Sequence, residues 1–325
     1  MIDFSILNYK EKFQGETMIA IEANNLTKNY KGFTALDKLS LNVMKGECFG
    51  ILGPNGAGKS TLISILYGAK KSDSGTLKIL DQEPSRKNRW LKEKIGIVTQ
   101  ENCLDESLNV FQNMMIYSQY LSIPKKKAKN KISELLEFMS LYHKKDFQIA
   151  ELSGGMKRRL AFVRALLSDP EILILDEPTT GLDPAVRKLM WNKIIELKSD
   201  KKMTILISTH YMDEAEQLAD KIVIIDKGKF QVQDHPKQIV KKHCPGYIAF
   251  FTKQTLSESI YKKYVNNKTI FNCNLHPYLC TLRYLTLDDL YNFIKKVNIQ
   301  PELIRPSNLE DVFLTLTGRK LSEHA

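Results

Sequence analysis

The sequence predicts an α/β fold in which helices cover both faces of a largely parallel sheet, followed by a smaller α+β unit. Two dense apolar segments, 172–175 and 205–207, are separated by a helical segment at 184–198. Strands that are apolar on both faces, joined by a helical crossover, are typical of buried parallel strands. After Pro236 the composition shifts to shorter mixed segments, which indicates a second unit.

The other segments are predicted from the periodicity of apolar residues and from the positions of glycine and proline. Strands are expected at 19–21, 39–43, 48–52, 75–79, 95–98 and 222–225, with a hairpin turn at 226–228. Helices are expected at 61–67, 110–121, 132–139 and 157–167. In the last part we expect strand 247–252, helix 255–265, a hairpin of 269–275 with 278–285, and helices 287–297 and 309–316.

These segments suggest an N-terminal extension (1–18), a main domain (19–235) whose part at about 101–160 is largely helical, and a C-terminal accessory α+β domain (236–325). Residues 1–17 are either a loose extension or precede a true start at Met18. No apolar stretch reaches ~18 residues, and no secretory start is visible, so we expect neither a spanning helix nor secretion.

Composition leaves several partners open. The net charge of +11 permits nucleic acid, anionic lipid or a polyphosphate ligand, or only a solvated basic surface. The five cysteines form no Cys-x-x-Cys pair, which favours a reducing, cytosolic compartment. A zinc site from Cys244, Cys273, His276 and Cys280 has irregular ligand spacing, and buried thiols with a turn histidine are the favoured interpretation.

A phosphate-binding loop follows the strand at 48–52. Residues 53–60 fit the pattern G-x-x-x-x-G-K-S, with a helix expected from Thr61. Such a loop turns its backbone N–H groups toward phosphate, and the helix dipole adds positive potential. Lys59 is expected at the β- and γ-phosphates, and the Ser60 hydroxyl at Mg²⁺. The predicted binding residues are Gly53, Asn55, Gly56, Ala57, Gly58, Lys59, Ser60 and Thr61.

Two adjacent acids end the buried strand at 172–175. Two carboxylates there are costly unless a cation is near, and Mg²⁺-ATP is the natural partner. We expect Asp176 to hold Mg²⁺, directly or through water, and Glu177 to act as the general base toward the attacking water.

A third motif, Leu152-Ser-Gly-Gly-Met-Lys-Arg-Arg159, stands shortly before the acidic strand. Here the sequence resembles the ABC (ATP-binding cassette) ATPase family, over about residues 19–235. The resemblance implies a P-loop NTPase cassette, with a mixed-sheet core and a helical subdomain, that binds ATP and Mg²⁺. It implies that Ser153, Gly154 and Gly155 open a helix facing a phosphate.

Four more positions match the family. Tyr30 stands where the family stacks an aromatic ring on adenine. Gln100 matches the glutamine that senses Mg²⁺ and water, and Asp183 ends the Gly-Leu-Asp loop that crosses between two cassettes. His210 matches the switch histidine at the γ-phosphate. The resemblance implies catalytic roles for Glu177, His210 and Gln100, and metal contacts for Ser60, Gln100 and Asp176.

The resemblance also implies partners. Two cassettes close head to tail, so this chain should pair with its own copy or a related cassette. Met156 stands where the family most often has glutamine, which removes any polar contact of that side chain. The motifs near 156, 180 and 210 and the end at 308–319 are similar to ATPases of bacterial drug and nodulation lipo-oligosaccharide exporters. That branch uses a separate membrane permease, which places the chain peripherally at the cytoplasmic face of the inner membrane.

Two other functions stay open. One is a soluble ABC ATPase acting on the ribosome or nucleic acid, although the chain lacks a second cassette or a long coiled-coil insert. The other is a nucleotide-binding regulator without transport, against which the complete catalytic set argues. The apolar residues at 110–121 form either core or a groove for a permease helix.

Overall fold

The computed structural model describes residues 18–85, 87–252, 256, 273–275 and 279–317. The predicted helix 255–265 lies outside these residues except for position 256, as do 1–17, 269–272 and the predicted turn at 276–278. Within the described part, each helix is too short or too polar to cross a bilayer.

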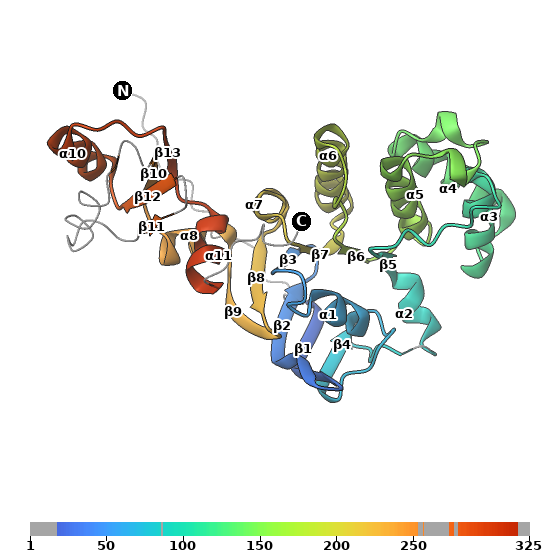
Figure 1. The fold of residues 1–325 in the computed structure, drawn as a ribbon. Helices are drawn as coiled ribbons and strands as arrows, with labels where there is room; N and C mark the ends of the chain where they lie inside the picture. Colours follow the sequence, from blue (N-terminus) through green and yellow to red (C-terminus); the bar gives the residue numbers. More distant parts are fainter. Residues whose placement is uncertain (1–17, 86, 253–255, 257–272, 276–278, 318–325) are drawn as a thin grey trace, which may run out of the picture.

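The centre of the main domain is a six-stranded sheet in the order β5-β6-β7-β3-β8-β9 (Figure 1). All neighbours pair in parallel except the hairpin of β8 and β9, so the predicted parallel sheet is confirmed. The strands are β3 (Cys48–Leu52), β5 (Ile95–Val98), β6 (Ile172–Asp176), β7 (Thr204–Thr209), β8 (Lys221–Asp226) and β9 (Lys229–Asp234).

A second, antiparallel sheet covers one side of the core in the order β2-β1-β4. Its strands are β1 (Ile19–Tyr30), β2 (Phe33–Met44) and β4 (Ser74–Ile79). Side chains from this sheet, from α1 (Lys59–Leu66) and from the central sheet form one buried cluster. The mixture of parallel and antiparallel sheets confirms the predicted mixed-sheet core.

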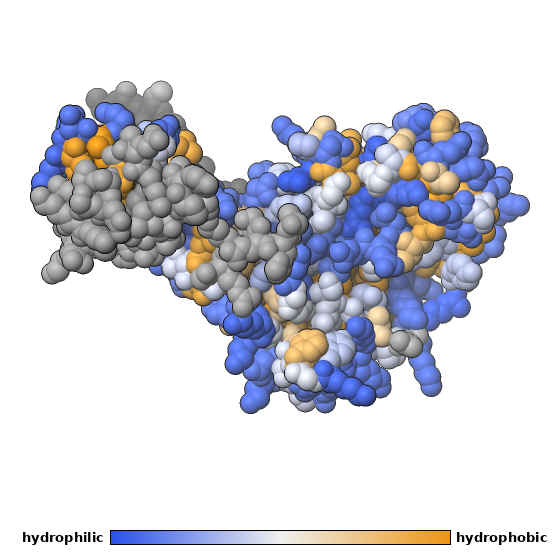
Figure 2. Space-filling model, in the orientation of Figure 1, coloured by the Kyte–Doolittle hydropathy of each residue, from blue (hydrophilic) through white to orange (hydrophobic). Residues whose placement is uncertain are grey.

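A helical part projects beyond the β5 and β6 edge of the sheet (Figure 1). It has its own buried cluster, which continues onto β6 and β7. Figure 2 shows mostly hydrophilic residues on this face of the molecule, with separate apolar patches over α6 and the helical part. The helices are α2 (Arg89–Lys94), α3 (Val110–Tyr120), α4 (Lys125–Phe138), α5 (Gly154–Leu166), α6 (Pro184–Lys201) and the short 3₁₀ turns at Tyr142–Lys144 and Ile149–Glu151.

The C-terminal part forms a four-stranded antiparallel sheet in the order β11-β12-β10-β13. Its strands are β10 (Tyr247–Thr252), β11 (Cys273–Leu275), β12 (Leu279–Tyr284) and β13 (Leu303–Pro306), and its helices are α8 (Pro236–His243), α10 (Leu287–Val297) and α11 (Leu309–Thr317). One buried cluster joins α10 to this sheet. A different one joins α8 and α11 to α7 (Met212–Leu218) and the central sheet. The domain boundary at 235 stays a prediction.

The predicted strands and helices in the described residues are confirmed, but β1, β2 and α4 are six to nine residues longer at one end than predicted. The helices α2, α7 and α8, the strand β13 and the two 3₁₀ turns were not predicted, and β9 only through the turn that precedes it. All are short segments in which a helical or strand period is weak.

Candidate functional site

The phosphate-binding loop lies between β3 and α1, as predicted. Gly58 precedes α1 with φ +107, and a side chain there would place its Cβ 2.4 Å from the carbonyl oxygen of Ala35. Only glycine fits this position. Lys59 is 4% exposed, and its Nζ donates to the carbonyl oxygens of Gly53 (2.8 Å) and Pro54 (3.1 Å). The lysine thus closes the loop on itself.

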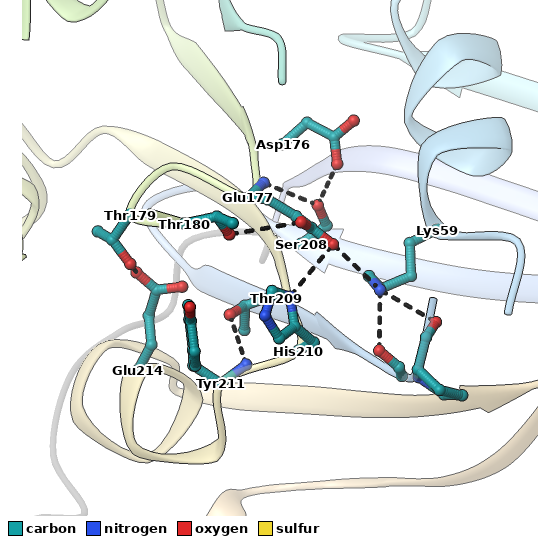
Figure 3. Close-up of polar contacts among 12 residues, drawn as sticks. Lys59, Asp176, Glu177, Thr179, Thr180, Ser208, Thr209, His210, Tyr211 and Glu214 are labelled. Atoms are coloured by element: carbon teal, nitrogen blue, oxygen red, sulfur yellow. Dashed lines mark hydrogen bonds and ion pairs between the residues drawn. The ribbon is translucent and has the colours of Figure 1, made fainter. Parts of the chain in front are cut away.

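Glu177 and His210 meet Lys59 at one point (Figure 3). Glu177 Oε1 lies 3.3 Å from Lys59 Nζ and 3.4 Å from His210 Nδ1. Thr180 donates to the other carboxylate oxygen at 3.4 Å. These side chains come from the ends of β6 and β7 and from the start of α1, so the parallel sheet brings them together.

The backbone of Glu177 has φ +48, in the left-handed region that costs energy for residues with a side chain. Its N–H donates to the carbonyl oxygen (3.0 Å) and the hydroxyl (3.2 Å) of Ser208. Because β7 supplies these two acceptors, the strained turn stays in place and aims the carboxylate at Lys59.

Charge and burial act against each other at this point. Interaction with His210, followed by the charge of Lys59, lowers the pKa of Glu177 to about 2 despite its burial. Burial lowers the pKa of Lys59, and the charges of Glu177 and Asp176 oppose that shift. The main cause is the contact with His210 for the pKa of Glu177 and burial for the pKa of Lys59. Both groups are ionised, because the Lys59 amine also donates to two carbonyls and faces two carboxylates.

Asp176 is buried at the end of β6 and accepts a short hydrogen bond from the Ser208 hydroxyl. Carboxylate, hydroxyl and amide oxygens are the ligands that Mg²⁺ prefers. A buried aspartate next to the loop, with the exposed Ser60 and Gln100 side chains, therefore fits a magnesium site.

One arginine of α5 holds the ends of two strands. Arg158 is 5% exposed and donates to the carbonyl oxygens of Asp176 (2.7 Å), Glu177 (2.8 Å) and Pro178 (2.9 Å). It also donates to the carbonyls of Thr99 and Gln100. Burial lowers its pKa to about 10, which leaves it charged at neutral pH. Gln100 is thus tied by its backbone to the turn that contains Glu177.

The hydroxyl of Tyr30 lies near the phosphate-binding loop. It accepts a hydrogen bond from Lys70 Nζ at 3.0 Å and also bonds Thr61. The bond from Lys70 is the largest cause of a lowered Tyr30 pKa. The ring stacks on Phe33, 5.5 Å between centroids, and Phe33 is 60% exposed. This pair offers an aromatic face beside the loop.

The Ser-Gly-Gly residues lie elsewhere. Ser153 caps α5, accepting from the N–H of Met156 at 3.3 Å. Asp183 caps α6, and Gly155 lies next to Leu182 and Val186. Among the described residues no hydrogen bond or ion pair joins this group to Lys59. Figure 1 draws α5 and α1 in different parts of the molecule.

Sequence reasoning assigned no role to four side chains: Phe33, Arg158, Ser208 and the buried Glu214 of α7, which accepts hydrogen bonds from Thr179 and Trp191. Arg158 and Glu214 are buried, yet in a sequence they resemble surface charges on helices. A signal was available for Ser208, because it directly follows a dense apolar strand.

Comparison with known proteins identifies the family. A family model described as ABC transporter matches residues 36–180. The chain is 37% identical to Nod factor export ATP-binding protein I of Burkholderia orbicola, covering 93% of this chain and 98% of that protein. A Rhizobium protein of the same name is 36% identical, covering 94% and 99%.

Solved structures are similar as well. A subunit of the cbiONQ ABC transporter complex from Clostridium perfringens is 30% identical, with a TM-score of 0.62, covering 77% of this chain and 95% of that one. A dimeric ATP-binding cassette in a post-hydrolysis state, bound to ADP and Pi, is 25% identical with the same TM-score, covering 66% and 98%.

Replacing Arg158 should destabilise the fold. Arg158→Ala leaves five buried or partly buried carbonyls without their donor, so we expect a loss of about 3 kcal/mol or more in urea unfolding. Arg158→Lys should lose less stability than Arg158→Ala, because it keeps the positive charge. It should still be less stable than wild type, because it lacks the planar guanidinium. The control is Arg164→Ala, whose guanidinium donates to one exposed carbonyl, that of Cys103. Equal losses for Arg158→Ala and the control would contradict this role.

The contribution of Glu177 to stability should depend on pH. Its pKa falls from 4.5 to about 2 on folding, so the stabilisation is complete above pH 4.5 and disappears as pH falls through 2. Glu177→Gln without nucleotide should therefore be less stable than wild type by about 2–3 kcal/mol at pH 7. The difference should narrow between pH 4.5 and pH 3 in denaturant titrations. A constant difference over this range would refute the pairing.

Proposed function

Since the chain belongs to the ABC transporter family, as an ATP-binding protein of the Nod-factor-exporter type, we propose that it hydrolyses ATP to drive a separate membrane permease. One observation supports this most strongly: a buried lysine, a carboxylate and a histidine converge where the loop opens. A triphosphate is the ligand that such a loop accepts.

In the mechanism, the phosphates of ATP compete for the partners of Glu177. Lys59 moves from the carboxylate and the carbonyls of Gly53 and Pro54 to the β- and γ-phosphates. His210 turns to the γ-phosphate. With both cationic partners withdrawn, the pKa of Glu177 rises from about 2. The carboxylate then becomes a better base for the attacking water, positioned by Ser208 and Thr180.

Ser60, Asp176 and Gln100 are the residues that would hold Mg²⁺. Bound there, the ion would neutralise charge on the phosphates. Tyr30, with Phe33 beside it, would stack on the adenine. The remaining loop residues bind phosphate through their backbone.

ATP also joins two cassettes. The N–H groups at the start of α5 are oriented for a phosphate, but lie away from the Lys59 of the same chain. We place the Ser153, Gly154 and Gly155 tip of one copy over the ATP held by the other, with Asp183 at the crossing. Hydrolysis removes the phosphate that both copies bind, and the pair opens.

A groove of about 320 Å³ between α2 and α3 is the proposed permease site. Its α3 side follows Gln100 in sequence, and the charged residues Arg89, Lys92 and Glu93 of α2 also line it. Trp90 and Tyr120 stand exposed nearby. The apolar and aromatic lining residues are Tyr67, Pro84, Leu91, Ile95, Ile97, Tyr117, Tyr120 and Leu121. This supports a peripheral position at the cytoplasmic face of the membrane.

The relatives named for Nod factor export support export over action on the ribosome or nucleic acid. We propose a drug-like, lipid or lipo-oligosaccharide substrate, which the permease selects.

Glu177→Gln should bind ATP but hydrolyse it at least about a hundredfold more slowly, because the amide cannot accept the proton. The trapped ATP should hold a dimer that size-exclusion chromatography detects with Mg²⁺-ATP. Near-normal steady-state turnover would remove Glu177 from the role of base.

Lys59→Ala should weaken ATP binding by tenfold or more, because it removes the only charge inside the loop. Isothermal titration with the hydrolysis-deficient Glu177→Gln background provides the measurement. Lys193→Ala, whose amine pairs with Glu196 within α6, serves as a control that leaves the loop and Tyr30 intact. Unchanged affinity in Lys59→Ala would show that nucleotide binds elsewhere.

A further inference from the structure

Helix α7 lies between the catalytic residues and the C-terminal helix α11. It begins two residues after His210 and makes contacts with both α6 and α11. In Figure 1 it stands between α6 and the pair α8 and α11. The C-terminal domain has no part in the mechanism above, so this helix is its direct route to the site.

The side of α7 toward the site holds a buried carboxylate. Glu214 is 1% exposed, and its Oε1 accepts from the Thr179 hydroxyl at 2.6 Å and from Trp191 Nε1 at 3.0 Å. The Thr209 side chain also bonds it. Thr179 comes two residues after Glu177, and Thr209 directly precedes His210 (Figure 3). One side chain therefore fixes the base turn against the histidine strand.

The other side of α7 packs on α11. Leu309, Val312 and Phe313 are fully buried in one cluster with Met212 and Ala215. The N–H of Leu309 donates to Glu216 Oε1 at 2.8 Å. An apolar contact and a charge-assisted bond together define the position of α7 relative to α11.

Helix α11 is in turn tied to the C-terminal sheet. Arg305 of β13 forms a bidentate pair with Asp311, at 2.7 and 2.9 Å. Arg283 of β12 donates to Thr315 at 3.2 Å and to Cys244 Sγ at 3.1 Å. Both arginines are part-buried or buried, where such bonds are strong. A displacement of the sheet is thus passed to α11.

We propose that the C-terminal domain positions the hydrolytic residues. Helix α11 fixes the position of α7, and Glu214 on α7 fixes the distance between Glu177 and His210. Glu214 and Phe313 are positioning residues, because neither touches the reacting atoms. The inference rests on the proposed ATPase function. It adds that the C-terminal domain governs the hydrolysis step more than nucleotide affinity, since Glu214 bonds the residues beside Glu177 and His210, whereas only Leu52, which precedes the phosphate-binding loop, shares the α11 cluster.

The test uses the full chain with Phe313→Ala. Small displacements of reacting groups lower rates strongly, so we expect kcat to fall about tenfold or more while the affinity for ATP stays within about twofold. Phe313→Leu should recover most of the rate. Glu214→Gln should show the same separation of kcat from affinity, and it leaves the α11 contact intact.

Phe293→Ala is the matched control. This buried aromatic of α10 packs on Phe251 and Tyr284 in the C-terminal core, away from α7. At a temperature where all variants are folded by circular dichroism, Phe293→Ala should lower kcat much less than Phe313→Ala, because its effect reaches α7 only through the sheet, its arginine contacts and α11. The inference is overturned if Phe313→Ala keeps its rate, if both phenylalanine variants lose rate equally, or if kcat and affinity fall together. A wild-type chain without ATPase activity would instead refute the proposed function.

Discussion

The buried charge of Lys59 is the constraint on which the rest of the site depends. A lysine that is 4% exposed loses most of its hydration, and that loss is costly unless anions or carbonyls replace the water. Glu177 and the carbonyls of Gly53 and Pro54 replace it here. A triphosphate offers more charge at the same point, so the residues that stabilise the empty loop are also the ones that ATP must displace.

The same logic explains Arg158. The carboxyl ends of β5 and β6 direct several carbonyl oxygens to one place, and a lysine could bond only some of them. The planar guanidinium spans both strand ends. Because Arg158 belongs to α5, the helical subdomain and the catalytic turn share one fixed contact. A rotation of that subdomain must move the turn with Glu177 or break the contact.

How far the sequence predicts this site depends on the range of the interactions. The loop at 53–60 and the acids at 176 and 177 are local patterns at strand ends, and parallel strands bring such ends to one edge. Lys59 and Glu177 were predicted for that reason, and His210 from the family resemblance at the end of the neighbouring strand. The partners of Arg158 and Glu214 were not, since they come from segments 18 to 59 residues away in the chain. Helix α7 has seven residues, too short for a periodic signal, and its position depends on α11, nearly a hundred residues later.

The start of α5 shows a constraint that one chain does not explain. Gly154 has an ordinary backbone conformation, and a side chain there would meet nothing within 4 Å. Alanine would fit at this first position of the helix, and glycine is the less favourable helix former of the two. Gly58, in contrast, is required by a neighbouring carbonyl of its own chain. No contact among the described residues therefore requires glycine at 154, whereas the proposed approach of a second cassette would use the bare backbone at this position. Its N–H groups and the helix dipole favour an anion, which a second cassette with bound ATP would present.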